Sequence, residues 1–249
     1  MKIRDVLGDR ARIGVVVPST NTILQPDCDD LRPLGVTNHT GRIPILQRAI
    51  TSDAAYADHL RMMAEGIGSA IDLVMSAGLD HVVMGVAIEA FQGGVAGAEK
   101  LQAELEQRAG VGVSMGGPAA KAALEKFGAK RIAVITPHPP RGDEIVRSYL
   151  TDAGFDVVRL HGFACETPHH IARVTKDEIR DVLHRIDGND VDAILQVGTN
   201  LSFMRLAAAS EEWLGKPVLA LNAVMYWDAL RRCGIEDRVH GFGRLLERF

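Results

Sequence analysis

Two residues that can transfer protons each follow a short apolar run in the sequence. Glu89 follows the run 82–86 and is the only charged residue in its own stretch, 86–94. His138 follows the run 131–136 and lies between two prolines, which stiffen its backbone. Loss of water raises the pKa of a carboxyl group, and a histidine titrates near neutral pH. We therefore predict that Glu89 and His138 form an acid/base pair, which could also activate a water molecule.

Both residues have simpler interpretations that the sequence leaves open. Glu89 can be a solvated carboxylate near a helix start, where the helix dipole favours a negative charge. His138 can belong to a surface loop that leads into a helix with Asp143 and Glu144 in its first turn.

The remaining candidates are groups that can hold a carboxylate by hydrogen bonds, by a guanidinium fork or by close backbone approach. These are Ser19, Asn21, Arg141, Gly198, Thr199 and Asn200. All of them follow apolar runs, as Glu89 and His138 do. Turns and helix caps have the same composition, so ordinary turns are the alternative at each point.

The apolar runs predict the strands that position these residues. The runs are continuous rather than alternating, which is typical of strands covered on both faces. We predict strands over 12–17, 82–86, 111–114, 131–136, 156–160, 193–197 and 217–221. We predict helices over about 53–77, 95–108, 118–127, 142–153, 175–187, 202–213 and 223–232. Thr175 and Glu178 form the capping box expected at one helix start.

Strands that alternate with helices predict a parallel α/β fold. The order of elements occurs twice, and the segment 83–91 is similar to 195–203. We therefore predict two pseudo-symmetric, doubly wound lobes, residues 1–128 and 129–249, with some C-terminal residues packing back on the first lobe. Ligands of such sheets bind beyond the carboxyl ends of the strands. The site is expected in the cleft between the lobes.

Composition and charge exclude several classes of function. The 249 residues include 28 basic and 32 acidic ones, for a net charge of −4, so no nucleic acid or membrane partner is expected. No apolar run reaches the roughly 18 residues of a transmembrane helix. The start of the chain lacks the apolar block of a secretory signal. Three well-separated cysteines, Cys28, Cys165 and Cys233, favour free thiols and a cytoplasmic location.

No cofactor or metal is expected. The glycine-rich patterns of dinucleotide sites and phosphate loops do not occur in the sequence. The adjacent pair His169 and His170 would not face the same way on a helix or a strand, so we do not assign a metal to it.

Several of these segments together resemble the aspartate/glutamate racemase superfamily, in the branch with maleate cis–trans isomerase and arylmalonate decarboxylase. The resemblance covers nearly the whole chain. The segments that carry it are 13–22, 131–137, 171–174, 198–201, 214–218 and 227–230. It implies two pseudo-symmetric lobes with the site between them, cofactor-free chemistry on a small carboxylate, and often an oligomer. We therefore expect a homo-oligomer.

The superfamily works with cysteine thiolates, one or two per site, and this chain departs from that pattern. In our alignment the two cysteine positions fall at Val86 and Gly198, and a position occupied by tyrosine in relatives falls at His138. The resemblance implies that Ser19, Asn21, Thr199 and Asn200 match its carboxylate-holding groups. We also expect Val86 and Ala87 to contribute to substrate binding. Neither valine nor glycine can transfer a proton.

Three hypotheses follow from the sequence. The first is a thiol-free enzyme that uses Glu89 and His138 for proton transfer, hydrolysis or lyase chemistry on a small carboxylate or related carbonyl compound. The second is an isomerase, racemase or decarboxylase with a displaced thiol, such as Cys165. The third is a non-catalytic protein that binds small carboxylates.

Overall fold

The computed structural model describes residues 5–45 and 53–249 and contains two parallel sheets of four strands each. The first half contains β1 (Ala11–Pro18), α1 (Leu24–Leu31), β2 (Val36–Ile43), α2 (Asp53–Met75), β3 (His81–Met84), the 3-10 turn η1 (Ile88–Ala90), α3 (Gly94–Ala109), β4 (Gly112–Met115) and α4 (Gly116–Lys126). The second half contains β5 (Arg131–Thr136), α5 (Pro140–Asp152), β6 (Asp156–Gly162), α6 (Pro168–Ile171), α7 (Lys176–Ile186), β7 (Ala193–Gln196), α8 (Met204–Leu214), β8 (Val218–Ala220), α9 (Leu221–Arg232) and α10 (Arg244–Arg248).

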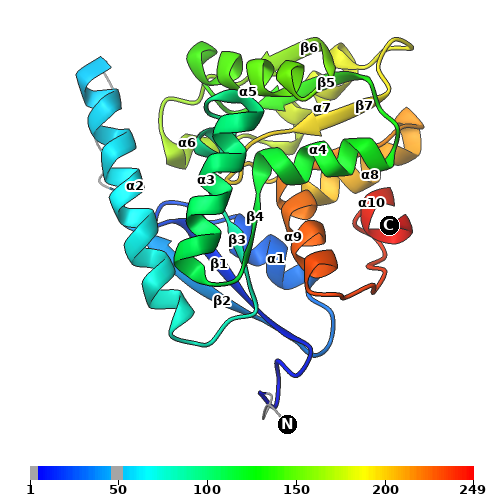
Figure 1. The fold of residues 1–249 in the computed structure, drawn as a ribbon. Coiled ribbons are helices and arrows are strands. Elements are labelled where there is room, and N and C mark those ends of the chain that lie inside the picture. Colours follow the sequence, from blue (N-terminus) through cyan, green and yellow to red (C-terminus); the bar gives the residue numbers. More distant parts are fainter. Residues whose placement is uncertain (1–4, 46–52) are drawn as a thin grey trace.

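Both sheets have the same strand order, β2-β1-β3-β4 and β6-β5-β7-β8. In Figure 1 the first sheet lies in the lower part, in blue to teal, and the second in the upper part, in green to orange. In each sheet the chain moves to one side of its first strand and then to the other. The point where it changes side is the place where ligands of such sheets bind. The α/β class and the two doubly wound lobes are confirmed.

The same local motif joins the two central strands of each sheet at their amino ends. Asp80 accepts the backbone N–H of Arg12 in the first sheet, and Asp192 accepts that of Arg131 in the second. Both carboxylates also form an ion pair with the side chain of the same arginine. The backbone N–H groups of Arg131 and Lys130, together with the Arg131 guanidinium, lower the pKa of Asp192 to about 2. This repeated motif supports the duplication inferred from the sequence.

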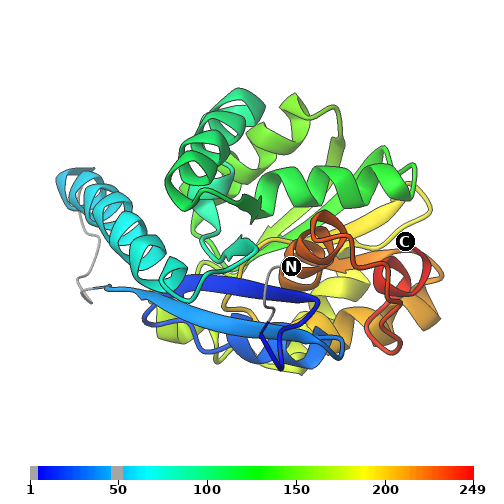
Figure 2. The same ribbon diagram turned by 60° about the horizontal axis from the view of Figure 1, so that its bottom comes forward.

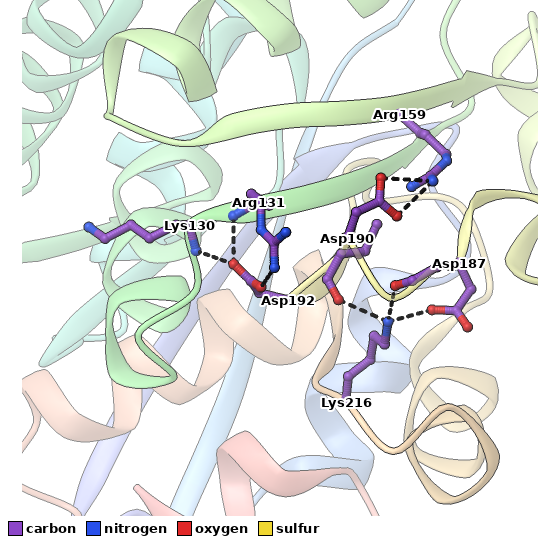
Figure 3. A network of polar contacts seen from close by, with 9 residues as sticks. Lys130, Arg131, Arg159, Asp187, Asp190, Asp192 and Lys216 are labelled. Carbon is purple, nitrogen blue, oxygen red and sulfur yellow. Dashed lines mark hydrogen bonds and ion pairs between the residues drawn. The ribbon is translucent and has the colours of Figure 1, made fainter.

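Figure 3 shows the polar contacts at this edge of the second sheet. Arg159 of β6 pairs with Asp190, at 2.7 Å. Lys216, just before β8, forms an ion pair with Asp187 and donates to the backbone carbonyls that precede β7. These contacts hold the amino ends of β5 and β7 and the segment just before β8, and Arg159 joins them from the middle of β6.

Helix α9 comes from the second half of the sequence but packs on the first sheet. It contacts α4, α1, β3 and β4, and Figure 2 shows it between the two sheets. A buried hydrogen-bonded chain holds it there, because Ser114 of β4 bonds His81 of β3, at 2.8 Å, and donates to Asp228 of α9, at 2.5 Å. The lobe boundary at residue 128 stays a prediction.

Replacing Ser114 with alanine is expected to lower the free energy of unfolding by about 1–3 kcal/mol, because His81 and Asp228 both lose a buried partner. Urea denaturation measures this loss. Ser69→Ala on the exposed face of α2 is the matched control and should change stability by less than about 0.5 kcal/mol. If the two variants unfold at the same urea midpoint, the hydrogen bonds of Ser114 contribute nothing to holding α9.

The structure confirms the predicted helices and strands to within a few residues, including the capping box of α7 at Thr175. The strand predicted over 82–86 ends at Met84, so Val86 lies in the loop that follows. Strand β2 was missed, because this edge strand has a polar sequence and few fully buried residues. Among the described residues, no helix is long and apolar enough to cross a membrane.

Candidate active site

A cavity of about 160 Å³ lies where the loops that follow β1, β3, β5 and β7 meet. These four strands are the central pairs of the two sheets, so the cavity combines both points where the strand order changes side. It therefore lies between the lobes, where the duplication predicts a site. Six polar residues line it, namely Thr20, Asn21, Glu89, His138, Thr199 and Asn200.

His138 lies in this cavity with only 8% of its surface exposed. Its N–H donates to Oγ1 of Thr136 at 3.0 Å, and its carbonyl accepts the N–H of Ala164 at 3.2 Å. Gly142 of α5 packs on the imidazole so closely that a Cβ there would lie 2.7 Å from the Cβ of His138. Two of these contacts fix the backbone of His138, and Gly142 limits the space on one side of its side chain.

The Nε2 atom of His138 is buried and has no hydrogen-bond partner among the described residues. Burial also lowers the pKa of His138 to about 4, so the imidazole is neutral at pH 7. A buried nitrogen without a partner is unfavourable unless a ligand or water satisfies it. The neutral ring can accept or donate one hydrogen bond or proton at this atom.

Glu89 reaches the same cavity from the turn η1 in the other half of the chain. The turn rests on α4, because a Cβ at Gly117 would lie 2.5 Å from the carbonyl of Ala90. Glu89 is half-buried, and burial raises the pKa of its carboxyl group above the usual range. It also borders an outer cavity of about 510 Å³ on the side of α2 and α3. The structure thus brings both predicted acid/base residues to one cavity.

The predicted carboxylate-holding residues Asn21, Thr199 and Asn200 line the cavity but also join the two halves of the chain. Asn21 Nδ2 donates to Thr199 Oγ1 at 3.0 Å, and this hydroxyl donates to the carbonyl of Gly85 at 2.9 Å. Asn200 accepts the N–H of Thr22 through Oδ1 and donates to the carbonyl of Pro168 through Nδ2. Each amide therefore has one N–H left for a ligand.

Val86, Ala87 and Gly198, which are predicted to bind the substrate, also line the cavity. Gly198 has no room for a side chain, because a Cβ would lie 2.6 Å from the ring of Pro137. Two predicted residues do not line the cavity. Ser19 is exposed, and its hydroxyl accepts the N–H of Ile45. Arg141 is exposed in the first turn of α5.

Sequence analysis missed most of the apolar wall, and from the polar turn 18–22, whose residues could hold a carboxylate, it selected Ser19 and Asn21 but not Thr20. Thr20 lies between Ser19 and Asn21 in a turn whose composition alone does not show which side chains point inward. The missed apolar residues come from the turns, from α2 and from α6, and are Pro18, Ile45, Met63, Ile88, Pro137, Pro168 and Ile171. No sequence signal distinguishes these positions from ordinary core residues.

None of the three cysteines is among the described residues that line the cavity. Burial raises the pKa of Cys28 and of Cys165, and it raises that of Cys233 to about 11. The nearby charge of Glu178 further disfavours the thiolate of Cys165. Since the thiolate is the reactive form of cysteine, these surroundings do not favour thiol chemistry. Among the described residues, no group of three metal-binding side chains occurs.

Acid is expected to destabilise the protein through His138 and His81. The pKa of each is lowered to about 4 by burial, so the unfolded chain binds more protons than the folded chain between about pH 6.5 and 4. Stability is therefore full above pH 6.5 and decreases by up to about 3 kcal/mol per histidine as the pH falls to 4. Urea midpoints at several pH values measure this loss. In His138→Asn the free energy of unfolding should depend less steeply on pH. The same dependence on pH in the variant and the wild type would exclude the contribution of His138.

Comparison with known proteins gives one family model, described as arylmalonate decarboxylase, that matches residues 13–246. A maleate isomerase of Pseudomonas putida is 26% identical over 246 residues, covering 94% of this chain and 96% of that protein. A structure of Nocardia farcinica maleate cis–trans isomerase with a covalently bound succinylcysteine intermediate has a TM-score of 0.86 at 20% identity, covering 96% of this chain and 99% of that one. A structure of arylmalonate decarboxylase has a TM-score of 0.77 at 20% identity, covering 95% and 99%.

Proposed function

Because the chain belongs to the arylmalonate decarboxylase family, we propose that it is a cofactor-independent enzyme acting on a small carboxylate or related carbonyl compound. We further propose that Glu89 and His138 carry out the chemistry without a thiol. The observation that carries this proposal is the buried, unpartnered Nε2 atom of His138 in a cavity that Glu89 also lines. The two groups come from opposite halves of the chain and so approach a ligand from two directions.

The environments of the two groups suggest complementary roles. Neutral His138 accepts a proton at Nε2 when its ring proton is on Nδ1. Glu89 holds a proton to a higher pH than an ordinary carboxyl group, because its charged form is poorly solvated. His138 would remove a proton from the substrate or from a water molecule, and Glu89 would donate one. This exchange suits proton transfer, hydrolysis or cleavage of a C–C or C–N bond.

Thiol chemistry is the first alternative. The succinylcysteine intermediate of the Nocardia farcinica enzyme shows that a relative reacts through a cysteine. In our alignment the corresponding positions of this chain are Val86 and Gly198, which carry no reactive group. Cys165 is buried, is not part of the described cavity lining and has a raised pKa. These observations favour the acid/base mechanism over a displaced thiol.

Replacing Cys165 with alanine is expected to leave turnover within about three-fold of the wild type, because the thiol takes no part in acid/base chemistry. Proton NMR in D₂O, applied to a panel of small carboxylates, amides and esters, detects both deuterium incorporation and product formation. Loss of turnover in the alanine variant, with the fold intact by circular dichroism, would support the displaced thiol instead.

A binding protein without catalysis is the second alternative, and the same panel tests it. Saturable binding of panel compounds without any deuterium incorporation or product would favour this alternative. The apolar wall and the unpartnered Nε2 atom fit either a binding protein or an enzyme. The raised pKa of Glu89 favours the enzyme, since perturbed titratable groups in a cleft mark sites of chemistry.

A further inference from the structure

We propose that helix α5, from the second half of the chain, positions Glu89 of the first half, and that Asp152 and Tyr149 are the positioning residues. Neither of them is among the described residues that line the cavity, so both act through the backbone that carries Glu89. The inference rests on the proposed function, because it concerns how one member of the acid/base pair is held.

The turn that carries Glu89 has few hydrogen bonds of its own. The N–H groups of Ala90 and Phe91 each donate to the carbonyl three residues earlier, at 3.1 and 3.0 Å. The link to α3 then passes through Gly93 and Gly94, whose φ angles are 79° and 68°. Glycine is the most flexible residue, so this link does not fix the turn by itself. Contacts with other elements must hold it in place.

Asp152, the last residue of α5, holds the chain just beyond these glycines. Its Oδ2 atom accepts the N–H of Val95, in the first turn of α3, at 2.7 Å. A first-turn N–H has no partner within its own helix, and a carboxylate is a favourable acceptor for it. The approach is close, because a Cβ at Gly94 would lie 2.6 Å from the same oxygen. The start of α3 is therefore fixed to the end of α5.

Tyr149 holds the chain just before the glycines and lies one turn earlier on α5. Its ring meets that of Phe91 edge to face, with the ring centroids 5.0 Å apart and the planes at 78°. Both side chains are fully buried, and such edge contacts between aromatic rings are favourable. The tyrosine also packs on α4, because a Cβ at Gly117 would lie 2.9 Å from its ring. Phe91, which ends the Glu89 turn, is thus held in place.

The other end of α5 lies against His138. A Cβ at Gly142 would lie 2.7 Å from the Cβ of His138 and 3.1 Å from Cδ1 of Ile88, the residue before Glu89. One helix therefore contacts the segments that carry both acid/base residues, although these come from opposite halves of the chain. The separation of the two groups then depends on α5 more than on how the two sheets lie relative to each other.

Kinetics of two variants at Asp152 test its role. Asp152→Ala removes the acceptor of the Val95 N–H and is expected to lower kcat at least ten-fold, with KM within about three-fold, because a displacement of about 1 Å can lower kcat by about 10²-fold. Asp152→Asn retains an oxygen that accepts this N–H and should stay within about three-fold of the wild type. Asp181→Ala, an exposed acid of α7, is the matched control. Equal kcat in Asp152→Ala and Asp181→Ala would overturn the role of Asp152.

Two measurements on Asp152→Ala report on the turn without any turnover. Amide exchange of Ala90 and Phe91 should become at least about ten-fold faster, whereas exchange in β5 should not change. The pKa of Glu89, followed by ¹³C NMR and assigned with Glu89→Gln, should fall towards the ordinary value, because a looser turn leaves the carboxyl group better solvated. Unchanged exchange of Ala90 and Phe91 would overturn the inference. So would equally faster exchange in β5, since the effect would then be a general loss of stability.

Two variants at Tyr149 test the ring contact with Asp152 in place. Tyr149→Leu removes the edge contact and is expected to speed amide exchange of Phe91 at least about ten-fold. Tyr149→Phe keeps the ring and should leave this exchange within about three-fold of the wild type. The same exchange rate in both variants would overturn the role of Tyr149. Circular dichroism checks that both variants fold.

The outcome is distinguishable from a failure of the proposed function. Undiminished turnover of Glu89→Gln would contradict the acid/base pair, while the expected amide exchange in Asp152→Ala would still show that α5 holds the turn. Loss of turnover in Glu89→Gln, with exchange and kcat of Asp152→Ala unchanged, would contradict this inference and leave the enzyme standing.

Discussion

Replacing His138 with asparagine is expected to lower kcat by about 10²–10⁴-fold, the range that a positioned acid or base contributes. Asparagine retains a polar group near the position of Nδ1 but removes Nε2, the buried atom that has no hydrogen-bond partner among the described residues. The loss should appear in kcat more than in KM, because the proton transfer occurs in the transition state. Steady-state kinetics on the most active compound of the panel measure it.

His161→Asn is the matched control for this prediction. His161 lies on β6, is half-buried and contacts Phe163 edge to face, but it is not among the residues that line the cavity. Its replacement should leave kcat within about three-fold, well below the 10²-fold expected of a catalytic group. A similar loss in both variants would point to a general effect on the fold, and no loss in His138→Asn would remove this residue from the mechanism.

Introducing cysteine at position 198, the predicted counterpart of a cysteine in relatives, is expected to damage the site rather than create a thiol enzyme. The new Cβ would lie 2.6 Å from Pro137, so this ring must move. Overpacking of this kind costs about 1–3 kcal/mol in the free energy of unfolding. Pro137 directly precedes His138, and a shift of about 1 Å in a catalytic group can lower kcat by about 10²-fold. Urea denaturation and kinetics measure the two effects.

Val86→Cys is the control, because it places a thiol at the other aligned position where a side chain already fits. The change from valine to cysteine removes little volume and should cost less than about 1.5 kcal/mol. Equal stability and equal turnover in the variants at positions 86 and 198 would show that Pro137 does not restrict position 198. A gain of activity in Gly198→Cys would contradict the thiol-free account of the site.

The fold could be predicted from the sequence because its strands are continuous apolar runs and their order repeats. Buried strands such as 131–136 have this pattern, whereas β2 is an edge strand with a polar sequence and was missed. For α9, the sequence predicted only that some C-terminal residues pack back on the first lobe. It did not predict which helix does so or where that helix lies. The polar chain through Ser114 that holds α9 joins residues far apart in the sequence. No local pattern indicates such a contact.

The site could be predicted in part, because strand ends are where ligands of these sheets bind. This rule found Glu89 and His138, and the structure places both in the cavity. It also selected Arg141 and Ser19, which follow strands as well but do not line the cavity. The rule predicts which edge of the sheet carries the site, but it does not predict whether a given side chain points into the cavity. Catalytic roles, the homo-oligomer and the cytoplasmic location stay predictions.

The pH dependence of kcat/KM for the wild type and for Glu89→Gln tests the acid/base pair most directly. In the wild type, activity should fall below about pH 4 as His138 becomes charged, and should fall again as the pH rises through the raised pKa of Glu89. The Gln variant should be about 10²–10⁴-fold slower and should lack the decline at higher pH. Undiminished turnover of Glu89→Gln, with the profile of the wild type, would contradict the account.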